Sequence, residues 1–125
     1  MAELLAQATV KKLRTRSIPL AAGAVKSPVS RFYGHRALAF HDLHPQAPVH
    51  VLLIPKKEIR SLNDPDAEDQ LLLGHLLMRV PVIAEQLGLT SGYRVVINCG
   101  RDAGQTVDHL HLHILGGRSL SWPPG

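Results

Sequence analysis

The sequence has little cysteine and no long apolar run. Cys99 is the only cysteine among 125 residues, so no disulfide forms within the chain. A lone cysteine is typical of proteins in a reducing compartment. No apolar run reaches the roughly 20 residues that a membrane-spanning helix needs, and the first residues lack the order of a secretory signal. We therefore expect an intracellular, cytoplasmic protein, with mitochondrial and nuclear locations as alternatives.

Acidic residues are scarce at the start of the chain. Residues 1–41 contain seven Lys or Arg and one acid, Glu3, whereas residues 42–125 contain seven basic and nine acidic residues. The net charge of +4 therefore arises from the first third of the chain, and we expect no nucleic-acid surface on the remainder. The basic segment fits a mitochondrial transit peptide, a flexible arm or a solvated terminus.

Apolar runs and turn residues predict one domain of the α+β class. Strands are expected at 31–33 and 36–42 around Gly34 and His35, at 49–55, at 93–98 and at 106–115. Asp64 and Pro65 predict the start of a long helix that ends near residue 87, before Gly88. Strands, one long helix and further strands predict an antiparallel five-stranded sheet with the helix on one face.

The expected helix is apolar around most of its circumference. Its polar residues fall on a single line, and a helix of this kind needs cover on more than one side. A single small sheet covers only one side, so we expect a second protomer to pack on this helix.

Three histidines at alternate positions are the most specific feature of the sequence. His109, His111 and His113 stand in "HLHLHILGG", and strand alternation predicts that all three project outward from one face. The intervening Leu110 and Leu112 would then face the core. Two functions compete for such a row, namely metal binding and nucleophilic attack.

Zinc binding by the row is the less favoured alternative. Two histidines at i and i+2 on a strand can share a zinc ion, but the outer two of three lie about 13 Å apart at Cα. Attack needs a nucleophilic imidazole and donors for a developing anion. A loop with Gly100 and Gly104, followed by Gln105 and Thr106, leads into the row and is suited to a phosphate.

The row and its surroundings resemble a known family. The segment "GQTVDHLHLHILGGR" and the terminal "WPPG" resemble the histidine triad (HIT) superfamily in its nucleotide-binding HINT branch. The resemblance extends through "GYRVVINCG", "LLGHLL", "PQAPVHVLLIPKK" and "LAFHD", and so covers residues 37–125. Residues 1–36 form a divergent basic segment outside it. The third histidine, where transferases of the superfamily carry glutamine, favours hydrolysis over transfer.

The resemblance implies a homodimer whose sheet continues across two protomers. It implies hydrolysis of the P–N bond of purine nucleoside phosphoramidates through a nucleotidyl-histidine intermediate, without a metal or other cofactor. It also implies binding of purine nucleoside monophosphates, with neither nucleic acid nor membrane as a partner. The alternative is a nucleotide-binding adaptor protein with little turnover.

The resemblance also implies a role for each site residue. His111 would be the nucleophile, and His113 would stabilise the phosphoryl oxygens. The supporting positions are His109 and His50 in the imidazole network, Gly104, Gln105 and Thr106 at the phosphate, and Asn98 at the phosphate or ribose. The nucleoside pocket would comprise Phe40, His41, Asp42 and Leu43, with the Asp42 carboxylate accepting from ribose hydroxyls. Trp122 in the tail would shape the partner's site.

The sequence departs from the family pattern at two places. Gly34, His35 and Arg36 replace the acidic turn that usually precedes "ALAF", which affects part of the base-binding wall. Asp108 stands where the family often has an aromatic residue. We expect its charge to raise the pKa of nearby imidazoles.

Overall fold

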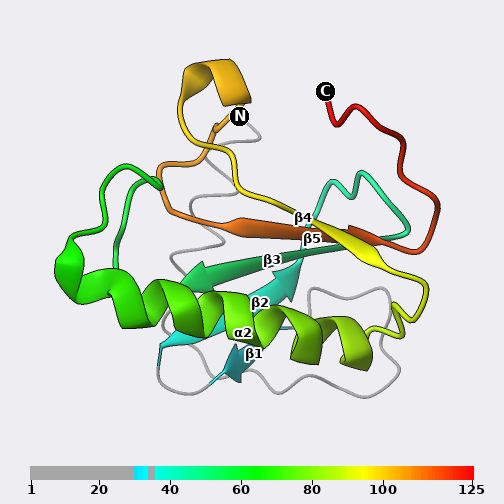
Figure 1. Ribbon diagram of the computed structural model, residues 1–125, viewed down its shortest axis with the longest axis horizontal. Coiled ribbons are helices and arrows are strands. Elements are labelled where there is room, and N and C mark those ends of the chain that lie inside the picture. Colours follow the sequence, from blue (N-terminus) through cyan, green and yellow to red (C-terminus); the bar gives the residue numbers. More distant parts are fainter. Residues whose placement is uncertain (1–29, 34–35) are drawn as a thin grey trace.

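The computed structural model describes residues 36–125 with their side chains and residues 30–33 by their backbone (Figure 1). Most of the divergent segment 1–36, including the expected turn at Gly34 and His35, lies outside the described residues. Within the described part of the chain, no helix is both long and apolar enough to cross a membrane.

The strands form one antiparallel sheet. They are β1 (Ser30–Tyr33), β2 (Ala37–His41), β3 (Val49–Pro55), β4 (Tyr93–Val96) and β5 (Leu112–Gly116). Their order across the sheet is β1-β2-β3-β5-β4, and each neighbouring pair is antiparallel. The expected α+β class with an antiparallel sheet is confirmed.

The long helix begins later than the sequence predicts. Asp66, rather than Asp64, is the cap: its carboxylate accepts from the backbone N–H of Glu68 in the short helix η1 (Ala67–Asp69). The Asp69 carboxylate in turn accepts from the backbone N–H of Asp66 at 3.1 Å. Asp64 instead accepts a hydrogen bond from the Ser61 hydroxyl at 2.6 Å, so it is a turn residue.

Helix α2 (Gln70–Gln86) follows η1 directly. It contains Pro81 and is followed by Gly88 at φ +73°, a left-handed conformation that glycine adopts without strain. The expected end of the helix is therefore confirmed. Because α2 runs across the sheet, its position defines two sheet faces (Figure 1).

The two faces of the sheet differ in what covers them. The face under α2 holds the main core, where Leu72, Leu76, Val80 and Ile83 of the helix pack against Ala37, Ala39, Val51, Leu53, Leu112 and Ile114 of the sheet. The opposite face holds a smaller apolar cluster of Leu38, Phe40 and Ile54. Strand alternation also places His50 and His113 on this opposite face, which we call the histidine face.

An ion pair links the end of β3 to the start of the helical region. The Lys57 ammonium donates to the Asp69 carboxylate at 2.6 Å, and the pKa of this carboxyl lies below its usual value chiefly because of that bond. A lowered folded-state pKa contributes stability above the unfolded value of about 3.9, and the contribution is lost as the pH falls through the folded value.

We therefore expect urea to unfold the protein at lower concentration at pH 3 than at pH 7, with a smaller difference in Asp69→Asn. Circular dichroism of both proteins at the two pH values measures this. Asp102→Asn, whose carboxylate is almost fully exposed, is the control and should keep the wild-type dependence. An unchanged pH dependence in Asp69→Asn would show that the ion pair does not cause the acid sensitivity.

Candidate active site

The histidine row is not a uniform outward-facing strand. Strand β5 starts at Leu112, so His109 and His111 precede it, and the strand expected from residue 106 is wrong over this part. His109 is buried, and its ring Nε2 lies 2.9 Å from the carbonyl oxygen of Pro55. Because a carbonyl only accepts, the Nε2–H of His109 is the donor. The first histidine therefore joins the row to the end of β3 and does not project outward.

His113 is paired with His50 across two neighbouring strands. His113 lies opposite Leu52 in the β3–β5 register, so His50 is its diagonal neighbour on the histidine face. The Nε2 of His50 and the Nδ1 of His113 are 2.8 Å apart, a hydrogen-bond distance. The expected place of His50 within an imidazole network is thus present in the structure.

The hydrogen bonds fix the neutral tautomers of both rings. The backbone N–H of Gln46 donates to the Nδ1 of His50 at 3.0 Å, so this nitrogen carries no proton. The proton of neutral His50 is then on Nε2, which donates to the Nδ1 of His113. It follows that neutral His113 carries its proton on Nε2 and presents it as a donor.

The middle histidine has the opposite tautomer. The Nδ1 of His111 lies 2.6 Å from the carbonyl oxygen of His109, so Nδ1–H donates, and in the neutral ring Nε2 then has the lone pair. The rings of His111 and His113 meet edge to face, with centroids 4.9 Å apart. A nucleophilic nitrogen and an N–H donor therefore stand on adjacent rings.

Asp42 adds a carboxylate to this network. Its backbone N–H donates to the carbonyl of His50 at 2.9 Å, which continues the β2–β3 pairing by one residue. Its Oδ2 lies 3.4 Å from the Nε2 of His50, and its Oδ1 accepts from the backbone N–H of His44 at 2.8 Å. One side chain thus contacts both the imidazole pair and the turn that presents Gln46.

Burial keeps the paired imidazoles neutral. Desolvation lowers the pKa of His113 to about 4, with smaller contributions from His111 and His50, while the Asp42 carboxylate acts in the opposite direction. Desolvation also lowers the pKa of His50, again against the attraction of Asp42. Both rings are therefore uncharged at pH 7, as the tautomer assignment requires.

Three possible metal ligands lie close together, and only His113 among them belongs to the row of three alternate histidines. The ligand atoms of Asp42, His50 and His113 lie within 4.8 Å of one another, whereas the buried His109 is directed to Pro55. The same three side chains form the hydrogen-bonded network described above, in which the Nε2 of His50 carries a proton that a metal ion would have to displace.

The loop between β4 and the histidines is held by Gln105. Its amide nitrogen donates to the carbonyls of Arg60 and Val107 at 2.8 and 3.1 Å, and its carbonyl oxygen accepts from the backbone N–H of Gly100. The side chain expected to contact a phosphate is thus engaged with the backbone. Gly104 has φ +82°, Thr106 is exposed, and Asn98 is half-buried after β4.

The residues expected in the nucleoside pocket are divided between the two faces. Phe40 is buried in the cluster on the histidine face, and Leu43 is 55% exposed beside Asp42. Strand alternation places His41 on the α2 face, where burial lowers its pKa. The structure thus brings Asp42 into contact with His50, places Phe40 on the same face of the sheet and directs His41 to the other face.

Asp108 is paired with Arg60. Its carboxylate accepts from the Arg60 guanidinium at 3.2 Å, and both side chains are largely exposed. Asp108 is not among the causes that shift the pKa of His41, His50 or His113. A solvated and paired charge has little effect on buried neighbours.

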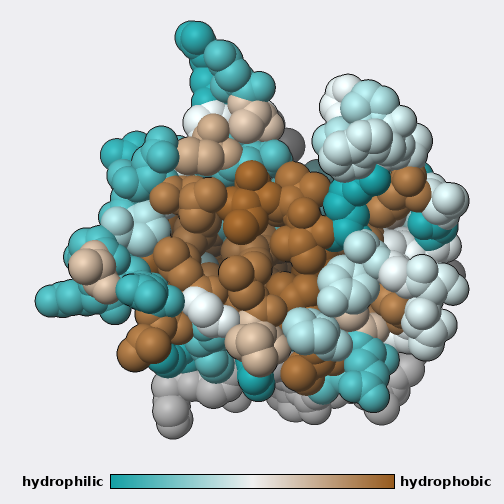
Figure 2. All heavy atoms as spheres, in the orientation of Figure 1, coloured by the Kyte–Doolittle hydropathy of each residue, from teal (hydrophilic) through white to brown (hydrophobic). Residues whose placement is uncertain are grey.

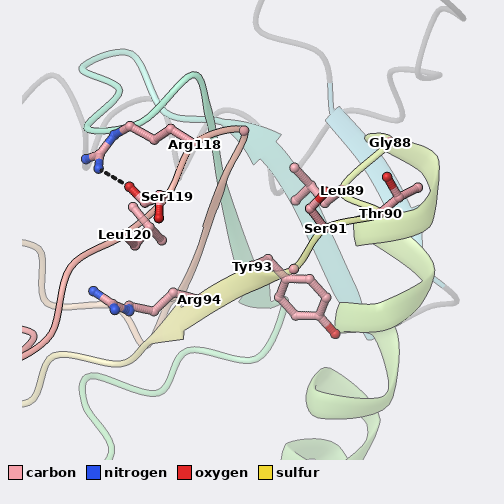
Figure 3. A pocket seen from close by; sticks show the side chains of 11 residues that line it. Gly88, Leu89, Thr90, Ser91, Tyr93, Arg94, Arg118, Ser119 and Leu120 are labelled. Carbon is pink, nitrogen blue, oxygen red and sulfur yellow. Dashed lines mark hydrogen bonds between the residues drawn. The ribbon is translucent and has the colours of Figure 1, made fainter.

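A cavity of about 620 Å³ lies away from the histidines, between the turn after α2 and the segment after β5 (Figure 3). It is lined by residues 88–94 and 117–120, and no residue of the expected site lines it. Arg94 of this cavity also holds the tail, since it donates to the Ser121 carbonyl at 2.8 Å and lies 5.9 Å from the Trp122 ring centre. Trp122 itself is 80% exposed.

Comparison with known proteins gives the family. The HIT domain model matches residues 30–120, and the chain belongs to the HIT domain family. An uncharacterised HIT-like protein of Synechococcus elongatus is 65% identical over 88 residues, which are 70% of this chain and 77% of that protein. A second uncharacterised HIT-like protein, from Synechocystis, is 60% identical over 88 residues and is covered to the same extent.

Solved structures show the same fold. A HIT family hydrolase from Legionella pneumophila has a TM-score of 0.74 and 45% identity, covering 83% of this chain and 94% of that one. A histidine triad protein from Clostridium difficile has a TM-score of 0.71 and 41% identity, covering 76% and 84%. The family and its fold are therefore established for this chain.

Three backbone groups that orient the site histidines were missed in the sequence. They are the N–H of Gln46 and the carbonyls of Pro55 and His109. A backbone partner leaves no mark on residue identity, so only the fold reveals them. Gln105 was singled out in the sequence, but for a different contact.

We expect His113 to titrate near pH 4, well below the usual value of about 6.5. In Asp42→Asn its pKa should fall further, since the carboxylate attracts the charged form. Replacing His111 by alanine should raise it by removing a repulsive neighbour. Imidazole carbon and nitrogen chemical shifts measured against pH test this, and a His113 that titrates between pH 6 and 7 would contradict the buried, neutral assignment.

Proposed function

We propose that this protein is a purine nucleoside phosphoramidase of the HINT branch, acting through a nucleotidyl-His111 intermediate. The observation that carries this proposal is the hydrogen bond from the Nδ1 of His111 to the His109 carbonyl. It leaves the Nε2 of a neutral imidazole free to attack without prior loss of a proton. The relationship to a HIT family hydrolase supports the reaction class.

The proposed reaction has two displacement steps at phosphorus. In the first, the Nε2 of His111 forms a bond to phosphorus while the P–N bond breaks, and the departing nitrogen leaves as an amine after taking up a proton. In the second, water loses a proton as it attacks phosphorus, and the nucleoside monophosphate leaves with His111 restored. Splitting one difficult hydrolysis into two easier steps is the usual advantage of a covalent intermediate.

His113 would assist both steps as a donor. Its Nε2–H is free because Nδ1 accepts from His50, and a developing charge on the phosphoryl oxygens needs such fixed donors. Phe40 and Asp42 lie on the same face and would hold the nucleoside. An ionised carboxylate only accepts hydrogen bonds, which suits the two hydroxyls of a ribose. Turnover in this arrangement requires no metal ion.

We also propose a homodimer formed across β4 and α2. Strand β4 is at the edge of the sheet, and its outer backbone groups are available to pair with another strand. Leu71, Leu77 and Met78 of α2 are 77%, 55% and 64% exposed. Figure 2 shows hydrophobic side chains gathered on this face, around α2 and β4. A second copy would cover this surface and would bring the exposed Trp122 near a neighbouring site.

We expect His111→Ala to lower the rate of adenosine phosphoramidate hydrolysis at least about a thousandfold, because the attacking atom is removed. Release of the amine and of the nucleoside monophosphate measures this. Rapid denaturation at alkaline pH followed by mass spectrometry should detect one nucleotidyl group on the wild type and none on the variant. Leu62→Ala, at an exposed position outside the site and outside α2 and β4, is the control and should retain the wild-type rate.

Equal rates in His111→Ala and the wild type would overturn the nucleophile assignment. Nucleotide binding by the wild type with no turnover and no covalent adduct would replace the enzyme by a nucleotide-binding adaptor.

We expect light scattering to give the mass of two chains for the wild type at micromolar concentration. Met78→Glu should weaken self-association about tenfold or more, since an unpaired charge would be buried in the interface. Leu62→Glu introduces the same charge at an exposed leucine outside α2 and β4, and should leave the mass unchanged. A wild-type mass of one chain would refute the dimer.

A further inference from the structure

We propose that Asp42 couples recognition of the sugar to the orientation of the catalytic imidazoles. A ribose diol bound to the Asp42 carboxylate would release the Nε2–H of His50 to His113 alone, so that the sugar affects the chemical step as well as binding. This inference rests on the proposed function and deepens it, since it assigns a positioning role to a residue expected only to bind ribose.

The coupling follows from one proton that two groups attract. The Nδ1 of His50 is occupied by the Gln46 N–H, so the ring has a single N–H to donate, on Nε2. That N–H donates to the Nδ1 of His113 at 2.8 Å. The Oδ2 of Asp42 lies 3.4 Å from the same nitrogen, a charge contact rather than a hydrogen bond, and its negative charge attracts the proton. The carboxylate therefore competes with His113 for the His50 proton.

A diol would change that competition. Asp42 Oδ1 already accepts from the His44 N–H at 2.8 Å, whereas Oδ2 is the oxygen directed to His50. The side chain is 19% exposed, so a ligand hydroxyl can reach it. A hydroxyl that donates to Oδ2 satisfies part of its negative charge and weakens its attraction for the His50 proton. The bond from His50 to His113 then strengthens.

The catalytic consequence is a better fixed donor at the phosphate. When the Nε2–H of His50 donates to the Nδ1 of His113, the proton of neutral His113 is fixed on its Nε2, which would face the phosphoryl oxygens. The groups facing His113 are His50 on β3, His111 before β5 and Asp42 after β2. Of these, Asp42 is the one that a sugar would contact directly.

The kinetic test compares adenosine and 2′,3′-dideoxyadenosine phosphoramidates. In the wild type, loss of the diol should lower kcat roughly three- to tenfold in addition to raising KM, as expected for one weakened hydrogen bond. In Asp42→Asn the amide oxygen can keep the bond to His44, but the amide nitrogen cannot accept from His50. The kcat of this variant should therefore be the same for the two substrates. Asp102→Asn should behave as the wild type.

A second measurement does not depend on turnover. Adenosine carries no phosphate, and 2′,3′-dideoxyadenosine has the same base and 5′-hydroxyl, so a change at His113 that adenosine alone causes depends on the diol. Saturating adenosine should change the nitrogen chemical shifts of His113, while saturating 2′,3′-dideoxyadenosine should leave them unchanged.

The two proposals fail in different ways. If no phosphoramidate is hydrolysed, the proposed function fails and the chemical shifts still decide the coupling. If the diol changes only KM in the wild type, and the two nucleosides shift His113 equally or adenosine does not bind, the coupling is wrong while the hydrolase stands.

Discussion

The hydrogen bond between His50 and His113 is the interaction on which the site depends. It joins β3 to β5 on the histidine face, and its direction is set by the Gln46 N–H at the other nitrogen of His50. Desolvation keeps both rings neutral, so each has one donor and one acceptor nitrogen rather than two donors. A charged His113 would lose the nitrogen that accepts from His50, and a charged His50 would lose the nitrogen that accepts from Gln46.

Much of the scaffold was predictable because it depends on local patterns. The apolar run of β3, the left-handed Gly88 and the core-facing Leu112 follow from strand alternation and helix termination. The start of the helix was misplaced because Asp64 and Asp66 are both acceptable caps, and only the reciprocal bond to Asp69 selects the second.

The sequence predicts most of the residues that gather at the site, but it does not predict how they are arranged. Three histidines at alternate positions suggested one exposed row, yet the chain before β5 departs from strand geometry and buries His109 against Pro55, 54 residues earlier. Gln105 was expected at a phosphate, and its amide instead joins both ends of the preceding loop. Contacts between distant segments and hydrogen bonds to the backbone leave no signal in the sequence. The position of His109 and the contacts of Gln105 therefore became visible only in the folded structure.

Three of the site histidines are hydrogen-bonded to backbone groups rather than to side chains alone. His50 is bonded to the amide of Gln46, His109 to the carbonyl of Pro55, and His111 to the carbonyl of His109. The two carbonyls are present whatever residues occupy these positions, and the N–H is present with any residue except proline. Substitutions in the surrounding side chains could therefore diversify the accepted substrates during evolution without disturbing the proton arrangement of the reacting rings.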